Sequence, residues 1–208
     1  MVLPATRVQP EAKPQASPDS PDANATFALI SLARSGDMAA FDRLMRQYER
    51  LVLMTALRFL NGNVSDAQDA ARNVFLRLHR SLGKFRNLTS EAGFSAWLYR
   101  ITVNVCHDMN RKTQRLAEVD LDHVAVVATI RHDDVAYDAE RKLQAVTVGL
   151  GQLGGKERAA IVLRDIEGLD TSQVASILGS SEATVRSQIS VGRRKLRKFA
   201  EAYLRRPL

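Results

Sequence analysis

Residues 170–199 read DTSQVASILGSSEATVRSQISVGRRKLRKF, and this stretch decides the class of fold. Asp170, with Gln173 three residues later, has the pattern of a capping box at the start of a short helix. Gly179 stands where a helix can end in a left-handed residue, and Ser181 can cap the helix that follows. A short helix, a turn containing glycine and a longer helix together predict a helix-turn-helix motif.

The second helix of this motif is predicted to have an apolar face and a basic face. Apolar positions recur every three or four residues, at Val185, Ile189, Gly192, Leu196 and Phe199. The opposite, exposed face carries Arg186, Ser187, Ser190, Arg193, Arg194 and Arg197. Arginine can bind guanine through two hydrogen bonds or contact phosphate, and serine can do either more weakly. We therefore predict that these six residues bind DNA, with a solvated basic face as the alternative.

The composition of the whole chain is consistent with an anionic partner. Its 208 residues carry a formal net charge of +7, which is typical of proteins that bind nucleic acid or a membrane surface. No stretch approaches the roughly 20 apolar residues of a membrane span, and the N-terminus lacks the apolar core of a signal peptide. A single cysteine, Cys106, excludes an internal disulfide. We expect a soluble, cytoplasmic protein without membrane insertion.

Proline divides the chain into regions. Five of the six prolines lie within the first 21 residues and the sixth is Pro207, so the stretch between them suits long helices. We predict a disordered tail over residues 1–25, a helical domain over 26–116, an acidic linker over 117–137 and a second helical domain over 138–208. The predicted fold is all-α, with two helical domains joined by a flexible linker and the helix-turn-helix in the C-terminal domain.

Helical periodicity places the individual elements. In the first domain it predicts helices over residues 37–60, from Ser65 with Gln68 completing a capping box, and over residues 95–116. In the second domain it predicts a short helix with the apolar face Leu143, Val146 and Leu150, followed by a helix over residues 156–166.

Basic and aromatic side chains gather around the predicted helix over residues 95–116. The candidates are Lys84, Phe85 and Arg86 in the loop before it and Arg100, Asn104 and Arg111 on its polar face. Bases stack on aromatic rings while basic groups pair with phosphates, so these residues are predicted to bind single-stranded nucleic acid. Core packing is the alternative for the aromatic rings, and it is the preferred interpretation for Trp97.

Three segments resemble, in order and spacing, those of one protein family over roughly residues 27–204. They are DAQDAARNVFLRL at 66–78, FSAWLYRITVN at 94–104, and residues 162–187, which begin with VLRDIEGL. The family is the extracytoplasmic-function (ECF) group of bacterial sigma factors. The resemblance implies an alternative sigma factor rather than an enzyme, with a role in a stress response. It also implies core RNA polymerase, promoter DNA and an anti-sigma factor as partners, and no cofactor.

The resemblance assigns a role to each region. The first domain would bind core polymerase through Asp66, Asp69 and Asn73 and melt the −10 element. The loop over residues 84–94 would hold a flipped-out base, and the linker would thread through polymerase channels. The recognition helix would read the −35 element. The acidic linker could mimic nucleic acid in a basic channel or serve as an ordinary linker.

The chain departs from the family's pattern at several places, among them a longer loop between Phe85 and Phe94, Gly154-Gly155 in place of a turn with proline, and Val191 in place of a basic residue. Residues 70–73, AARN, stand where the family usually has apolar residues followed by glutamine and an acidic residue. Gly192 stands where alanine is common, and a glycine inside a helix costs it about 1 kcal/mol.

Three other classes of protein fit the sequence less well. A helix-turn-helix regulator that is not a polymerase subunit would need a ligand pocket or a phospho-acceptor pattern, and neither is evident. An enzyme acting on nucleic acid is disfavoured, because the four histidines form no metal-ligand spacing with Cys106 and no phosphate-binding glycine loop or serine elbow is present. No catalytic or metal site is therefore predicted. The arginine-rich helix argues against a pure interaction module such as an anti-sigma partner.

Overall fold

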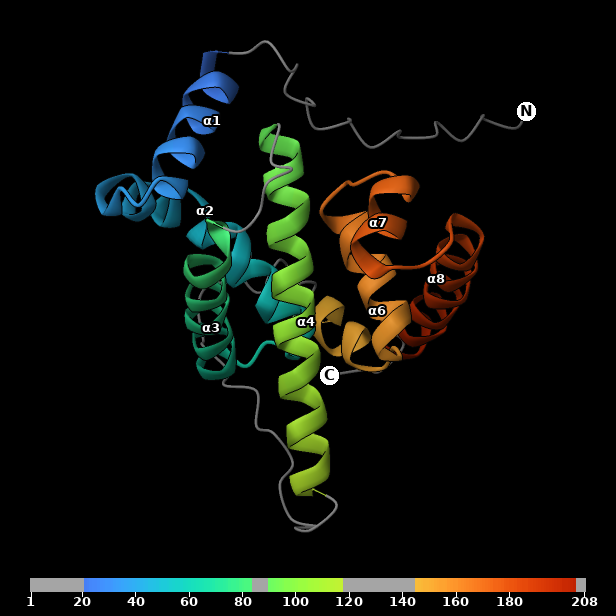
Figure 1. Cartoon of the computed structure of the whole chain (residues 1–208). Helices are drawn as coiled ribbons and strands as arrows, with labels where there is room; N and C mark the ends of the chain where they lie inside the picture. The colour runs from blue at the N-terminus through green and yellow to red at the C-terminus, as the bar shows by residue number, and fades with distance from the viewer. Residues whose placement is uncertain (1–20, 84–89, 118–144, 205–208) are drawn as a thin grey trace, which may run out of the picture.

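The computed structural model describes residues 21–83, 90–117 and 145–204, and every regular element in these ranges is a helix. This confirms the all-α prediction for the described residues (Figure 1). The first 20 residues of the predicted tail, the loop over residues 84–89 and almost all of the predicted linker lie outside the described residues.

The N-terminal half of the described chain consists of four helices, α1 (Pro21–Arg34), α2 (Met38–Phe59), α3 (Val64–Leu82) and α4 (Glu91–Ala117). Its core forms where the apolar faces of α2, α3 and α4 meet, because each helix repeats apolar residues at helical spacing. Fully buried members of this core include Leu44, Val52, Val74, Leu78, Phe94 and Leu98.

The C-terminal half begins with a helical segment at residues 145–151 and continues with α6 (Gly155–Ile161), α7 (Thr171–Leu178) and α8 (Glu182–Leu204). The predicted helix over residues 156–166 is present, but its second part is the π-helical segment η1 (Val162–Ile166). Here the Glu167 amide donates to the Val162 carbonyl, five residues back, at 2.9 Å. Such π turns are rare and often lie at functional sites.

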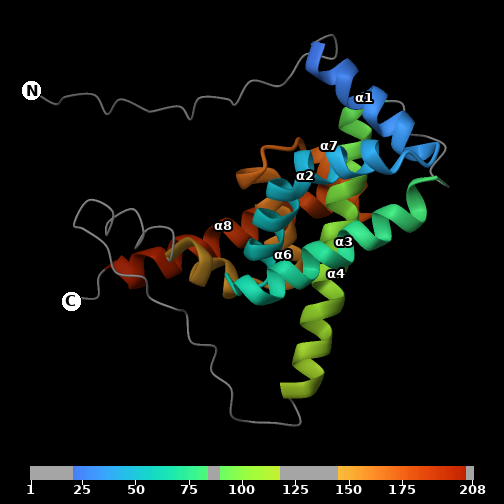
Figure 2. The ribbon, with the colours of Figure 1, turned by 90° about the vertical axis from the view of Figure 1, so that its left-hand side faces the viewer.

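Helix α4 lies at the boundary of the two halves, with α2 and α3 of its own half on one side and α6 to α8 on the other (Figure 1). In the perpendicular view its last turns project beyond the other helices (Figure 2). Buried residues from both halves form one continuous core, so the two predicted helical domains pack directly against each other. The sequence did not predict this contact.

Two predicted helix starts and the end of the predicted tail are wrong by a few residues. Helix α1 begins at Pro21, inside the predicted tail over residues 1–25, because proline fits a first helical turn, where its missing amide hydrogen is not needed. Helix α3 begins at Val64 because Asn63 is its cap and accepts a hydrogen bond from the Asp66 amide at 3.1 Å. The predicted capping box of Ser65 and Gln68 is therefore wrong.

Helix α4 begins at Glu91 rather than at residue 95. The Ser90 side chain accepts a hydrogen bond from the Gly93 amide at 3.1 Å, which satisfies a free donor of the first turn. The apolar face predicted for the short helix of the second half is also partly wrong. Leu150 is buried, but Val146 is 49% exposed, and Leu143 lies outside the described residues.

Candidate nucleic-acid interface

The predicted helix-turn-helix is confirmed in its local chemistry. The Asp170 side chain accepts a hydrogen bond from the Gln173 amide at 2.8 Å, and the Gln173 side chain accepts one from the Asp170 amide at 2.9 Å. Gly179 ends α7 with φ +60° and ψ +39°, which is the left-handed conformation. The Ser181 hydroxyl accepts from the Thr184 amide at 3.2 Å and caps α8. Hydrogen bonds from the Gln173 amide and the Ser172 hydroxyl lower the pKa of Asp170.

Burial on one side of α8 fixes which side chains face outward. Val185 and Ile189 are buried, while Gly192 lies against α6. A Cβ atom added at Gly192 would lie 2.8 Å from Cγ1 of Ile161, so a larger residue would require the Ile161 side chain or one of the two helices to shift. The family departure at this position therefore has a packing reason, which the sequence alone did not give.

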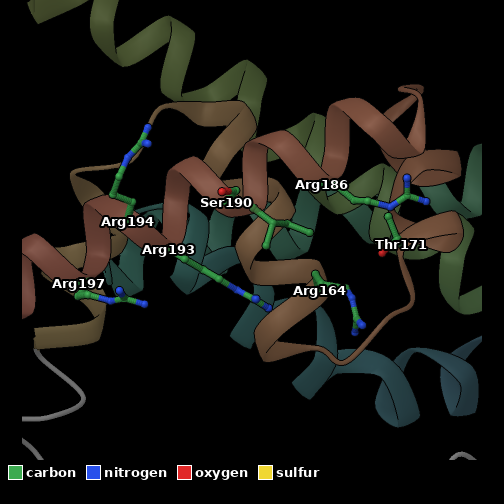
Figure 3. A pocket seen from close by; sticks show the side chains of 8 residues that line it. Arg164, Thr171, Arg186, Ser190, Arg193, Arg194 and Arg197 are labelled. Atoms are coloured by element: carbon green, nitrogen blue, oxygen red, sulfur yellow. The ribbon is translucent and has the colours of Figure 1, made fainter.

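An open groove of about 520 Å³ runs along the exposed face of α8 (Figure 3). Its lining residues are Arg164, Thr171, Arg186, Ile189, Ser190, Arg193, Arg194 and Arg197. Five of the six predicted DNA-binding residues therefore meet at one groove, while Ser187 is exposed on α8 but does not line it. Sequence reasoning missed Arg164 and Thr171, because they join α8 only through the tertiary fold.

The arginines of the groove differ in how they are held. Arg193 donates two hydrogen bonds to Asp165 of η1, which raises the pKa of its guanidinium. Arg186 pairs with Glu182 one turn earlier on α8. Within the described residues, Arg194 and Arg197 have neither an ion pair nor a side-chain hydrogen bond. In Figure 3, Arg193 points toward the segment that carries Arg164, whereas Arg194 leaves the other edge of α8.

The residues predicted to bind single-stranded nucleic acid are only partly described. Arg100, Asn104 and Arg111 are exposed along α4, whereas Lys84, Phe85 and Arg86 lie outside the described residues. Asp108, which sequence reasoning missed, accepts a hydrogen bond from Arg77 of α3 at 3.1 Å and lies 4.0 Å from Arg111.

The aromatic side chains at the start of α4 belong to the core. Phe94 is fully buried, and its ring lies 5.0 Å from the ring of Tyr48 and 6.1 Å from that of Trp97. Trp97 is partly buried against the same cluster, which confirms its predicted core packing. Cys106 is buried as well, and burial raises the pKa of its thiol to about 12.

The residues predicted to bind core polymerase lie on one face of α3, because they are spaced by three and four residues. Asp69 and Asn73 are exposed and Asp66 is half-buried. The exposed apolar side chain of Leu76, 52% accessible, extends this face by one more turn. Of the atypical segment AARN, the two alanines are buried in the core and only the last two residues reach the surface.

Neither a metal-binding cluster nor a membrane-spanning helix is found in the described ranges. Residues 21–83, 90–117 and 145–204 contain no cluster of three or more histidine, cysteine, aspartate or glutamate side chains that could hold a metal ion. None of the helices in the same ranges is long and apolar enough to cross a membrane.

Two protein-family models match this chain and identify its class. Residues 44–116 match the family model for Sigma-70 region 2, and residues 143–196 match the model for Sigma-70, region 4. A helical N-terminal half followed by a helix-turn-helix is thus the pair of conserved regions of a Sigma-70-type protein.

Individual relatives narrow the class to one group. The chain is 36% identical over 186 residues to the ECF RNA polymerase sigma factor SigE of Mycolicibacterium smegmatis, covering 87% of this chain and 68% of that protein. It is 34% identical over 168 residues to the ECF RNA polymerase sigma factor SigM of Mycobacterium tuberculosis, covering 81% of each. Among solved structures, CnrH in complex with the cytosolic domain of CnrY is similar, with a TM-score of 0.63, 27% identity and coverage of 86% and 98%.

The chain therefore belongs to the ECF group of RNA polymerase sigma factors. It is an alternative sigma factor that binds core RNA polymerase and directs promoter-specific initiation of transcription.

Proposed function

We propose that the two halves of this sigma factor read different promoter elements, with α8 reading the −35 element as a duplex. The observation that carries this proposal is the arginine-lined groove on the exposed face of the second helix of a capped helix-turn-helix. Arg186 and Ser187 lie in the first turns of α8, the part of a recognition helix that usually enters the major groove. Arg194 and Arg197 lie further along and are free of ion pairs within the described residues, which suits phosphate contacts.

The N-terminal half is proposed to recognise and open the −10 element. Arg100, Asn104 and Arg111 project from exposed positions along α4, which suits contact with a single strand. The loop residues Lys84, Phe85 and Arg86 join them in this proposal on the strength of their sequence. Phe94 and Trp97 are left out, because both rings belong to the core.

The face of α3 that carries Asp66, Asp69 and Asn73 is proposed to bind core polymerase. Leu76 adds an exposed apolar side chain to that face, and apolar contacts surrounded by polar groups are typical of protein interfaces.

We also propose an anti-sigma factor as a regulatory partner. The similar structure of a sigma factor RpoE from Bartonella quintana is a complex with the anti-sigma factor NepR, at a TM-score of 0.61 and 19% identity. Because chromosomal DNA and core polymerase lie in the bacterial cytoplasm, we place the site of action there. In this proposal the chain supplies recognition and strand opening, while the polymerase supplies all catalytic groups.

In-vitro transcription with core polymerase and genomic fragments tests the proposed function. We expect new start sites that depend on this chain, and we expect Arg186→Ala to reduce their selectivity. The matched control is Lys198→Ala, which removes a positive charge from an exposed position of α8 outside the groove and keeps the start sites unchanged. Start sites that stay equally selective with Arg186→Ala would overturn the assignment of the −35 element to α8.

A further inference from the structure

The first turn of the recognition helix α8 carries a carboxylate among its basic side chains. Glu182 is the first residue of α8, and its side chain is 45% exposed. It accepts a hydrogen bond from Nη2 of Arg186, one turn further along the helix, at 2.5 Å. The side chain of Arg186 is 64% exposed, so both members of the pair are open to a partner. We refer to these two residues as the Glu182–Arg186 pair.

The carboxylate of Glu182 is not needed to cap α8. The Ser181 hydroxyl accepts a hydrogen bond from the Thr184 amide at 3.2 Å and satisfies a free donor of the first turn. A capping box would require glutamate or glutamine at the third position of the helix, where α8 has Thr184. Glu182 follows the cap directly, and its carboxylate is bound to Arg186 instead. It therefore stands beside the arginine that is proposed to enter the major groove.

The other arginines of the groove are held differently. Arg193 is bound to η1, whereas Arg194 and Arg197 have no ion pair within the described residues. Figure 3 shows Arg186 at one end of the groove and Arg197 at the other. An arginine without a partner suits a phosphate, which every DNA sequence offers. The partner of Arg186 lies on α8 itself, in the turns of a recognition helix that usually reach the base edges.

A carboxylate and a guanidinium bind complementary groups in the major groove. Guanine presents two acceptors there, O6 and N7, which a guanidinium binds with two hydrogen bonds, while the N4 amino group of cytosine donates to a carboxylate. A guanidinium has five N–H donors, so the bond to Glu182 leaves enough donors for guanine. Residues one helical turn apart have Cβ atoms about 5–6 Å apart, and base pairs follow each other at about 3.4 Å. The Glu182–Arg186 pair can therefore contact neighbouring base pairs.

The effect of the carboxylate on affinity points to selectivity as its role. DNA phosphates repel Glu182, so it weakens binding of α8 to every sequence alike. An exposed ion pair between residues one turn apart adds little to the stability of a helix. Selectivity is often obtained by disfavouring the wrong partner, and a carboxylate on a basic surface does this for bases that present acceptors.

We infer that Glu182 is a specificity-determining residue of the −35 interface, where it accepts a hydrogen bond from the N4 amino group of a cytosine beside the guanine bound by Arg186. The inference rests on the proposed reading of the −35 element by α8. Adenine, guanine and thymine all present an acceptor at this edge, which a carboxylate disfavours. Because Glu182 also orients Arg186, the pair reads two neighbouring base pairs as a unit.

The test uses the holoenzyme of the full chain with core polymerase, which selects from duplexes randomised over the −35 element. For the wild type we expect a preference of about tenfold for cytosine at one position, next to a guanine whose selection depends on Arg186. Glu182→Ala should lose this preference and bind the other sequences more tightly at low salt. Glu182→Gln should shift the preference toward adenine, because an amide side chain bonds both N6 and N7 of adenine.

A control variant and a modified base separate base reading from a general effect of charge. Glu201→Gln removes the same charge from an exposed position near the other end of α8, and it should leave every base preference unchanged. N4-methylcytosine keeps the base pair but replaces the amino hydrogen that faces the major groove with a methyl group. Placed at the selected cytosine, it should weaken binding of the wild type by about tenfold and that of Glu182→Ala only slightly.

The variants also distinguish this inference from the function on which it rests. The inference is overturned if both Glu182 variants keep the base preferences of the wild type while Arg186→Ala changes them. The proposed reading of the −35 element by α8 would then still stand, and Glu182 would serve only the helix. If Arg186→Ala and both Glu182 variants leave every preference unchanged, the proposed role of α8 fails, and the inference fails with it.

Discussion

The guanidinium of Arg193 is bound to the carboxylate of Asp165 by two hydrogen bonds, from Nε at 2.9 Å and from Nη2 at 2.6 Å. The pair joins the middle of α8 to η1, at the edge of the groove. A carboxylate at this place both orients the arginine and neutralises its charge. Arg193 is therefore less available to DNA phosphates than Arg194 or Arg197.

Replacing Asp165 by asparagine tests this view of Arg193. The change releases a positive charge beside the groove, and each phosphate that is newly neutralised steepens the dependence of log K on log salt by about 0.9. We expect tighter binding to −35 duplex at low salt and a salt slope steeper by about one unit. The loss of stability is expected to be below about 1 kcal/mol, because the pair is partly exposed. Equal slopes for Asp165→Asn and wild type would place Arg193 away from the phosphates.

Replacing Arg186 and replacing Arg197 by alanine are expected to change DNA binding in different ways. Arg186→Ala should relax base preference at one −35 position and cost about 1–3 kcal/mol there. Arg197→Ala should weaken all sequences alike and reduce the salt slope by about one unit. The measurement is binding of the full chain to a promoter library at several salt concentrations. An even loss of affinity across the library for Arg186→Ala would make Arg186 a phosphate contact and move base reading toward Ser187 and Ser190.

The Gly192→Ala substitution has two opposing effects of similar size on the stability of the protein. Alanine favours a helix over glycine by about 1 kcal/mol, but its Cβ would lie 2.8 Å from Cγ1 of Ile161, and overpacking a core costs about 1–3 kcal/mol. We expect net destabilisation by about 1 kcal/mol in urea unfolding. Gly93→Ala is the control, because its nearest neighbour would lie at 3.4 Å and it should be neutral or slightly stabilising. A more stable Gly192→Ala variant would mean that Ile161 moves aside easily.

The helix-turn-helix could be predicted from the sequence because its signals are local. A capping box, a glycine at the helix end and a periodic apolar face all act within a few residues, and each is present in the structure. At the start of α3 the sequence offers two possible capping residues, Asn63 and Ser65. The prediction chose Ser65 and is wrong, because Asn63 caps α3.

The contacts between distant segments could not be predicted in the same way. Glu167 meets Arg58 across 109 positions of sequence, and neither residue differs locally from an ordinary surface charge. The two added members of the groove, Arg164 and Thr171, reach α8 for the same reason, through packing that no periodicity encodes. The glycine at 192 is a further case, since its close neighbour lies on another helix.

Asp170 links the stability of the helix-turn-helix to pH. Its pKa is lower in the folded state than the value near 3.9 expected when unfolded, so its stabilising effect is present above that value and is lost as pH falls through the folded pKa. We expect Asp170→Ala to cost about 1 kcal/mol at pH 7, with a smaller difference below about pH 4. Asp170→Ser retains a capping oxygen without the charge, so it should stay stable at pH 7 and show less loss in acid. A constant cost of Asp170→Ala from pH 7 to pH 3 would contradict this role.

The last prediction concerns the face of α3 and binding of core polymerase. Replacing Asp66 and Asp69 together by alanine should weaken binding to core polymerase, because charged groups at an interface must be matched by the partner. Asp66 lies in the first turn of α3, where an acidic side chain stabilises the helix by about 0.3–1 kcal/mol through its dipole, and Asp69 pairs with Arg72 on the same helix. Asp42→Ala on α2, which removes an exposed carboxylate paired with Arg46, is the matched control. If the double variant loses stability but keeps its affinity for polymerase, the two carboxylates serve only the helix, and the interface must be sought around Asn73 and Leu76.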